Sequence, residues 1–172
     1  RTENVYSFTS EINAMGMTPS STILEFEVMS PPPDIVSMLE LESSSVKIYR
    51  FSRIRNVNGQ PLILETSFYP TYIYPKLTRE LLETHSFYSL LYEEGIVPYS
   101  AVDSYEAVIL GRREAELLGC RPGSCAFSVQ RRTRTEAGSV YEFTQSLIRA
   151  DRVTLDVYLH KDGVSFARSV DK

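Results

Sequence analysis

Apolar and polar residues alternate along much of the chain, as expected for strands that bury one face. The alternating segments are rich in Val, Ile and Tyr, which favour strands. We expect strands at residues 22–28, 46–57, 61–69, 97–110, 126–135, 140–149 and 152–159. Turn residues at 58–59 and 136–138 separate two pairs of these segments, so each pair is predicted to form a hairpin.

Shorter segments with helical spacing lie between the strands. We expect helices at residues 9–15, 34–41, 77–82, 86–93 and 112–118. The order of elements lacks the regular strand–helix alternation of a parallel sheet. It predicts an α+β domain with a mostly antiparallel sheet of about six strands and with helices packed against one face.

The composition fits a single domain. The chain has 172 residues, of which 42% are hydrophobic and 23% charged, an ordinary globular balance. We assign residues 1–160 to the domain and expect residues 161–172 to form a loosely held polar tail. The chain begins at Arg1 without an initiator Met, which is compatible with a fragment that has lost an upstream domain.

Charge and residue counts exclude several function classes. The 18 Lys and Arg against 22 Asp and Glu give a net charge of −4, which is poorly suited to gripping DNA phosphates directly. No apolar run approaches the roughly 20 residues that span a bilayer, and no signal peptide opens the chain, so we expect a cytoplasmic protein without membrane contact. The spacing of Cys120 and Cys125 matches no redox or zinc signature, and we expect no metal or other cofactor.

The first predicted hairpin carries three charged residues among apolar ones. Arg53 and Arg55 are two apart and share a strand face, where two guanidinium groups suit a phosphate or carboxylate. The place of Glu65 depends on the turn. A two-residue turn would put it on the opposite face, whereas a three-residue turn would return it to the arginine face. The sequence leaves this open, and an exposed face with a surface ion pair is the alternative to a binding site.

Two predicted helix starts add further candidates. A helix start presents unpaired N–H groups and the positive end of the helix dipole, both of which attract anions. Ser7, Phe8 and Thr9 open one helix, and Ser86 followed by Tyr88 opens another. Ordinary N-capping is the alternative explanation for these hydroxyl residues.

The second predicted hairpin offers one acid. Glu142 shares a strand face with Thr144, Ser146 and Ile148. Its carboxylate is suited to accept hydrogen bonds from a polyol, or else to pair with Arg132 across the strands. The chain has no nucleophile elbow, no phosphate-binding glycine loop and no His–carboxylate metal pattern, so we predict no catalytic residue.

Taken in order, short segments along nearly the whole chain resemble the UTRA domain, the ligand-sensing C-terminal half of bacterial GntR-type transcription regulators of the HutC subfamily. No single segment is specific, but the ordered set is. The segments are Ser7-Phe8-Thr9, Gly16-Met17-Thr18-Pro19, Arg53-Ile54-Arg55, Gly59-Gln60-Pro61, Glu65-Thr66-Ser67-Phe68-Tyr69-Pro70, Ser86-Phe87-Tyr88, Leu117-Leu118-Gly119, Pro122-Gly123-Ser124, Glu142-Phe143-Thr144-Gln145-Ser146 and Arg149-Ala150-Asp151-Arg152.

The resemblance implies a chorismate lyase-like fold and an N-terminal winged-helix DNA-binding domain that is absent from this chain. It also implies small anionic effectors, often phosphorylated sugars and sometimes carboxylates. In the sugar-phosphate sensors of the family, one set of positions surrounds the anion and another faces the sugar. The first set matches Ser7, Phe8, Thr9, Arg53, Arg55 and Ser86, and the second matches Glu65, Tyr88 and Glu142. Ile148 stands where such sensors often carry Tyr.

We therefore expect the effector-binding domain of a homodimeric, cytoplasmic transcription repressor. Its partners would be a small anionic metabolite, a second copy of the chain and, only through the absent domain, operator DNA. A chorismate lyase-like enzyme acting on a carboxylated substrate is one alternative. A ligand-free dimerisation module with a collapsed pocket is another.

Overall fold

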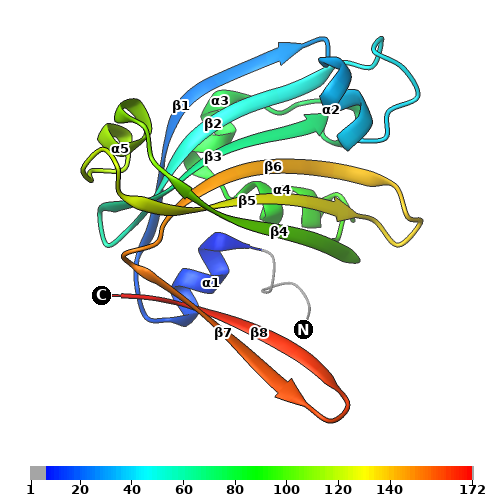
Figure 1. The fold of residues 1–172 in the computed structure, drawn as a ribbon. Coiled ribbons are helices and arrows are strands. Elements are labelled where there is room, and N and C mark those ends of the chain that lie inside the picture. Colours follow the sequence, from blue (N-terminus) through cyan, green and yellow to red (C-terminus); the bar gives the residue numbers. More distant parts are fainter. Residues whose placement is uncertain (1–6, 172) are drawn as a thin grey trace.

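The computed structural model describes residues 7–171 and confirms the predicted α+β class. Six antiparallel strands form one curved sheet in the order β1-β2-β3-β6-β5-β4, and two more form a separate hairpin, β7–β8 (Figure 1). The strands are β1 (Pro19–Met29), β2 (Ile48–Val57), β3 (Gln60–Pro70), β4 (Ser100–Ile109), β5 (Cys125–Arg134), β6 (Val140–Arg149), β7 (Val153–His160) and β8 (Gly163–Val170).

Residues 7–171 also form five short α-helices and one 3₁₀ turn, of which α1 precedes the first strand and the others connect strands. They are α1 (Phe8–Ala14), α2 (Pro33–Met38), η1 (Thr71–Ile73), α3 (Arg79–Thr84), α4 (Phe87–Glu93) and α5 (Arg112–Leu117). The helices were expected on one face of the sheet, and that expectation is wrong. Helices α1, α3 and α4 contribute to apolar clusters on one face, whereas α2 and α5 contribute to clusters on the other.

Helices cover the second face of the sheet because the side chains on that face are also apolar. Leu64, Phe68, Phe143 and Leu147 point away from the arginine face of β3 and β6, and they are apolar. Such residues must be buried, so α2 packs over one end of this face and α5 over the other. The central strands are therefore covered on both faces, which makes the polar residues buried within them conspicuous.

The hairpin β2–β3 settles the position of Glu65. Asn58 and Gly59 both have positive φ (50° and 77°), and Val57 pairs with Gln60, so the turn is the two-residue one. A register shift follows, because Asn56 pairs with Pro61 and Arg55 with Ile63. This bulge inserts one extra residue and returns the alternation to phase.

As a result, Glu65 lies directly opposite Arg53. The expectation that a two-residue turn would separate the acid from the arginines is wrong, because it did not include a bulge further along the strand. The turn is also fixed to the start of β1. The Asn58 backbone N–H donates to the Thr18 carbonyl, and the Thr18 N–H donates to Asn58 Oδ1, each at 2.9 Å.

The C-terminal segment is not a loose tail, contrary to the expectation for residues 161–172. Strand β8 pairs with β7 along its full length, from His160–Gly163 to Val153–Val170. The base of the hairpin is anchored because Val153 and Val170 are buried in the apolar cluster that includes α1. The segment carries alternating apolar residues, but its Gly, Ser and charged residues concealed that pattern.

Candidate functional site

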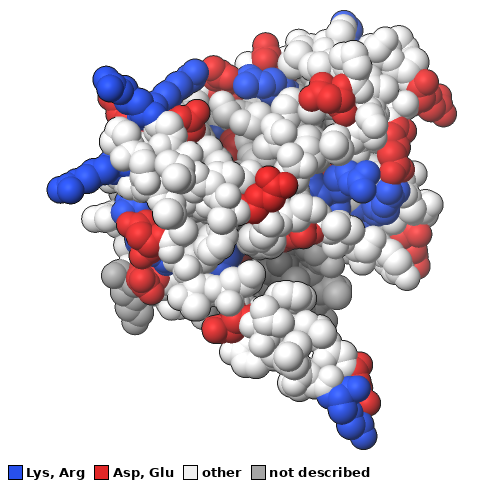
Figure 2. Space-filling view, in the orientation of Figure 1, with Lys and Arg blue, Asp and Glu red and all other residues white. Residues whose placement is uncertain are grey.

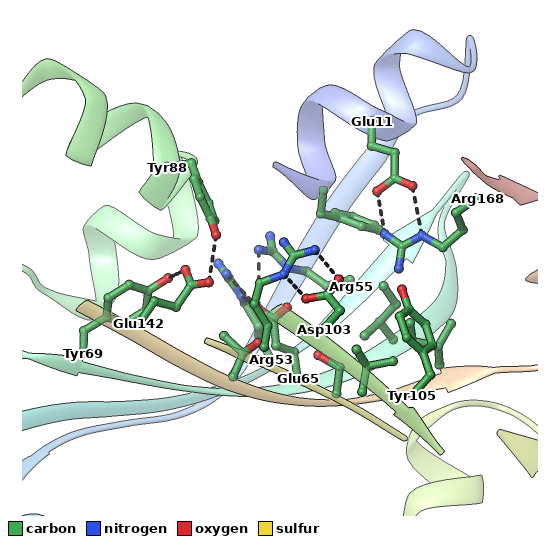
Figure 3. Close-up of a pocket in the computed structure, with 17 residues that line it drawn as sticks. Glu11, Arg53, Arg55, Glu65, Tyr69, Tyr88, Asp103, Tyr105, Glu142 and Arg168 are labelled. Atoms are coloured by element: carbon green, nitrogen blue, oxygen red, sulfur yellow. Dashed lines mark hydrogen bonds and ion pairs between the residues drawn. The ribbon is translucent and has the colours of Figure 1, made fainter. Parts of the chain in front are cut away.

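A polar pocket lies on one face of the sheet, between two apolar clusters. One cluster is aromatic and includes Phe51, Tyr69 and Phe87, and the other joins Phe8 of α1 to Ile148 of β6. The pocket has a volume of about 60 Å³ and is lined from α1, α4 and strands β2 to β6 and β8. Figure 3 shows charged side chains from these elements pointing toward one another across it.

The centre of the pocket is a group of two arginines and one glutamate. Arg53 and Arg55 are only 2% and 7% exposed. Nε and a terminal nitrogen of Arg53 each lie 2.9 Å from Oε1 of Glu65, and a terminal nitrogen of Arg55 lies 3.5 Å from the same oxygen. One carboxylate oxygen thus serves both guanidinium groups, which leaves this end of the pocket with an excess positive charge.

Arg55 is the less satisfied of the two arginines. One terminal nitrogen donates to Ser21 Oγ at 3.0 Å, and its guanidinium lies over the Phe8 ring, 5.1 Å from the centroid. Its Nε is buried and has no hydrogen-bond partner among residues 7–171. A buried donor without a partner destabilises the protein by roughly 1–3 kcal/mol, so this group is disposed to take an acceptor from a ligand.

The pKa values reflect these contacts. Burial, together with the like charge of Arg53, lowers the pKa of Arg55 to about 10. For Glu65, burial by itself would raise the pKa, but the charges of Arg53 and Arg55 outweigh it and lower the pKa to about 2. At neutral pH Glu65 is therefore an ionised acceptor, and Arg55 carries a positive charge whose burial is unfavourable.

A second polar group lies toward α4. Glu142 is buried and accepts hydrogen bonds from three hydroxyls, those of Tyr69, Tyr88 at 2.8 Å and Thr133 at 2.8 Å. Burial and the neighbouring carboxylate raise the pKa of both tyrosines well above the ordinary value, so they remain donors. The alternative of a Glu142–Arg132 pair is wrong, because Arg132 instead lies 3.9 Å from Glu40.

Two bidentate ion pairs form the wall on the side of β4 and the hairpin β7–β8. Arg131 donates through Nε and a terminal nitrogen to the two carboxylate oxygens of Asp103, each at 2.7 Å. Arg168 of β8 contacts Glu11 of α1 in the same way, at 2.9 and 2.5 Å. Burial by itself would lower the pKa of Arg131, but the hydrogen bonds that Arg131 donates to Asp103, together with the negative charges of Asp103 and Glu142, raise it above the ordinary value. Each of these pairs is neutral as a unit.

The structure brings together six of the nine residues singled out in the sequence. Phe8, Arg53, Arg55, Glu65, Tyr88 and Glu142 line the pocket. The other three, Ser7, Thr9 and Ser86, are not among the lining residues. Ser7 instead caps α1, with its hydroxyl accepting from the Ser10 N–H at 3.4 Å, and Ser86 occupies the N-cap position of α4 without a side-chain cap hydrogen bond.

Sequence reasoning missed the wall of ion pairs. Glu11 was not among the candidate residues, and Arg168 lay in the supposed tail. Asp103 and Arg131 are directly opposite each other on β4 and β5, and Arg131 in turn opposes Thr144 of β6. The cross-strand register could have paired Asp103 with Arg131, but predicting it requires the exact length and path of the connection between β4 and β5, which contains α5.

A pocket with several convergent charged side chains on one face of a sheet is a candidate ligand-binding site. Residues 14–154 match the model of the UTRA domain family, which is most of the chain. The chain therefore belongs to the UTRA domain family, and it is an effector-binding domain of the type found in GntR-family transcription regulators.

Among similar proteins is the HTH-type transcriptional repressor NagR of Bacillus subtilis, 27% identical over 92% of this chain and 65% of NagR. Another is the HTH-type transcriptional repressor PhnF of Mycolicibacterium smegmatis, 23% identical over 90% of this chain and 63% of PhnF. The chain thus spans less than two thirds of the length of these relatives.

Solved structures share the fold. The crystal structure of the effector domain of PhnF from Mycobacterium smegmatis superposes with a TM-score of 0.80, at 24% identity, and covers 90% of this chain and 94% of that chain. The ligand-binding domain of a putative GntR-family regulator from Bordetella bronchiseptica gives a TM-score of 0.71 at 24% identity, over 89% of each chain.

Two further findings concern residues 7–171. None of their helices is both long enough and apolar enough to cross a membrane. They also contain no cluster of three or more His, Cys, Asp or Glu side chains arranged to hold a metal ion.

Proposed function

We propose that this domain binds a small organic anion, such as a sugar phosphate or a carboxylate, between Arg53 and Arg55, and that binding modulates DNA binding by an N-terminal domain of a longer repressor. The observation that carries the proposal is the local excess of positive charge at the end of the pocket where Arg53 and Arg55 meet Glu65. Two buried guanidinium groups share one oxygen of Glu65, and the buried Nε of Arg55 is without a hydrogen-bond partner in the described part of the chain.

The DNA-binding part of the proposal is supported by the relatives. NagR and PhnF are named HTH-type repressors and are longer than this chain. In such a protein the effector would favour one arrangement of two DNA-binding domains over another, and so change their fit to two half-sites. A coupling free energy of about 1–3 kcal/mol between the two sites is sufficient for regulation.

Assembly as a homodimer is supported by an exposed apolar face on the hairpin β7–β8. Val157, Leu159 and Val164 share this face toward the tip of the hairpin, and Leu159 is 77% exposed. In Figure 2 the hairpin, at the bottom, is mostly uncharged, with charged side chains near its tip. Contiguous exposed apolar residues mark interaction surfaces, and a second copy of the same face would cover this one.

A catalytic role is disfavoured by the way the carboxylates of the pocket are engaged. Glu11, Glu65 and Asp103 are paired with arginines, and Glu142 accepts from three hydroxyls. None of these four groups is free to act as a general base, which must reach the proton that it removes. We therefore assign the pocket to binding and not to turnover.

A thermal-shift screen with inorganic phosphate, sugar phosphates and organic acids tests the proposal. A ligand at about 100 times its Kd adds about 2.7 kcal/mol of stability, which raises the Tm of a domain of this size by roughly 5–10 °C. Arg55→Met should abolish the response. Arg132→Met is the matched control, because Arg132 is on β5 and pairs with Glu40 outside the pocket.

The screen has two clear outcomes. Stabilisation of the parent and of Arg132→Met, but not of Arg55→Met, supports anion binding at the arginines. If no anion stabilises the parent, or if Arg55→Met responds like the parent, the proposed function is wrong. Incubation with chorismate, followed by analysis of the products, checks the assignment to binding, since turnover would contradict it.

A further inference from the structure

A second hollow lies directly beyond the wall of ion pairs. It has a volume of about 430 Å³ and runs between the edge strand β4 and the hairpin β7–β8. It shares five lining residues with the inner pocket, namely Glu11, Asp103, Tyr105, Arg131 and Arg168. The two hollows are therefore adjacent compartments on either side of the same side chains. We call the larger one the outer groove.

The sizes of the two compartments indicate how a ligand would use them. The inner pocket, at about 60 Å³, has room for about two water molecules, since each water occupies about 30 Å³ of liquid. Sites for whole metabolites are usually about 300–1,000 Å³. The outer groove falls within that range, whereas the inner pocket by itself is suited to little more than an anionic headgroup.

The charges are arranged in the same order. At one end of the inner compartment, Arg53 and Arg55 share Glu65 and leave a local excess of positive charge, whereas Glu142 lies at the other end, toward α4. The shared wall consists of Tyr105 and two bidentate pairs, each of which is neutral. Beyond the wall, the residues that line only the outer groove are all apolar. They are Ala101, Leu155, Phe166 and Ala167.

From these three observations we infer that the effector site is bipartite and that the effector is an amphipathic organic anion. Its charged head lies at Arg53 and Arg55, its neck passes between the Arg131–Asp103 and Arg168–Glu11 pairs, and its apolar or aromatic body lies in the outer groove. The position of the head rests on the proposed function, and the nature of the body rests on the groove alone.

The apolar part of the groove, beyond the shared wall, discriminates against a highly hydroxylated body. Hydroxyl groups that lose water against Ala101, Leu155 and Phe166 find no hydrogen-bond partner there, and such desolvation is unfavourable. An aromatic or alkyl body gains by the same burial. The apolar residues Ile63, Val129 and Ile148 at the floor of the inner pocket extend this preference inward.

Calorimetric titration with a series of probes tests the inference. The probes are inorganic phosphate, methyl phosphate, phenyl phosphate and a hexose 6-phosphate. The three esters have the same monoester head, so the differences among them report on the body, and inorganic phosphate reports on the head alone. We expect phenyl phosphate to bind at least tenfold more tightly than methyl phosphate, and more tightly than the hexose phosphate.

A pair of variants locates the effect. Leu155→Asn, in the groove, should remove the advantage of phenyl over methyl phosphate and leave the affinity for inorganic phosphate unchanged. Ile109→Asn is the matched control. Ile109 is exposed at the end of β4 and lines neither compartment, so this variant should keep the full advantage.

The outcomes separate the two proposals. If methyl and phenyl phosphate bind equally well, or if the hexose phosphate binds best, the bipartite site is wrong while anion binding at the arginines stands. If none of the four probes binds the parent protein, the head site fails, and both proposals fall. The probe series needs no variant, so a Leu155→Asn protein that does not fold would not prevent a decision.

Discussion

At the scale of single residues, the two arginines of the site have different energetic roles. Arg53 makes two contacts of 2.9 Å to Glu65, whereas Arg55 makes one contact of 3.5 Å and has an unpartnered Nε within the described residues. Arg53 therefore compensates the buried glutamate, and Arg55 is a buried charge with little compensation. Functional sites often retain such an unfavourable group because the ligand satisfies it.

This difference predicts opposite results for two matched substitutions. Arg53→Met should lower the free energy of unfolding by about 3–5 kcal/mol, because it leaves Glu65 buried with only a weak partner. Arg55→Met should leave the free energy of unfolding unchanged or raise it, because it removes a charge that burial disfavours. Urea unfolding without ligand measures both, and a large loss of stability in Arg55→Met would contradict this account.

The pH dependence of stability should report on Glu65. Its pKa falls from the ordinary 4.5 to about 2 in the folded protein, so the folded state binds fewer protons than the unfolded state between these values. Its contribution to stability is complete above about pH 4.5 and is lost as the pH falls toward 2.

Comparison with Glu65→Gln isolates this contribution from that of other acids. The parent should be more stable than the variant at neutral pH, and the difference in unfolding free energy should shrink from pH 4.5 to 2. Urea unfolding at several pH values provides the data. A difference that stays constant over this range would show that Glu65 is not held in its ionised form by the arginines.

At the scale of elements, the hairpin β2–β3 shows what the sequence could and could not predict. The alternation of apolar residues and the Asn58-Gly59 turn predicted both strands and left two turn types open. The bulge between Pro61 and Ile63 has no comparable signal, yet it determines the face on which Glu65 lies. The predicted shared site requires Glu65 on the same face as the arginines. The structure places it there by a two-residue turn with a bulge, and not by the three-residue turn that the prediction required.

The same limit applies to the rest of the site. Residues that belong to one strand, such as Arg53 and Arg55, could be placed on a common face from their spacing. Residues brought together from distant elements, such as Glu11 and Arg168, could not, because their contact depends on where the hairpin β7–β8 packs. Helix-start serines were singled out by local chemistry, and for Ser7 capping accounts for that chemistry.

The turn offers a prediction for the element as a whole. Gly59 has a φ of 77°, and a Cβ added there would meet no atom within 4 Å, so the effect of Gly59→Ala is purely one of backbone strain. The variant should lose roughly 1–2 kcal/mol of unfolding free energy. Its anion response should persist, since the strand register is also fixed by the bulge and by β1. Thermal unfolding with and without phosphate measures both, and a lost response would show that the turn alone positions Glu65.

At the scale of the whole molecule, the hairpin β7–β8 connects the site to the proposed dimer. Its base holds Arg168 against Glu11 at the pocket wall, and its outer half exposes an apolar face. A ligand that changes the wall would therefore act on the element that is proposed to contact the second copy. A two-stranded ribbon with one apolar face is marginal by itself, so a partner would stabilise it.

The dimer proposal predicts that Leu159→Glu weakens self-association, because it would bury a charge in an apolar interface. Tyr158→Glu is the control, since Tyr158 points to the opposite face of the same hairpin and is also exposed. Sedimentation velocity across a concentration series distinguishes monomer from dimer. Equal association of both variants and the parent would place the interface elsewhere.

The central claim is that an anion is held by the buried guanidinium groups of β2. Phosphate titration of isotope-labelled protein, followed through the arginine Nε–H signals in NMR spectra and assigned with Arg53→Met and Arg55→Met, observes this directly. We predict that the Arg55 Nε–H signal shifts in a saturable manner and becomes protected from exchange as it gains an acceptor. A signal that stays unchanged up to saturating phosphate would contradict the account.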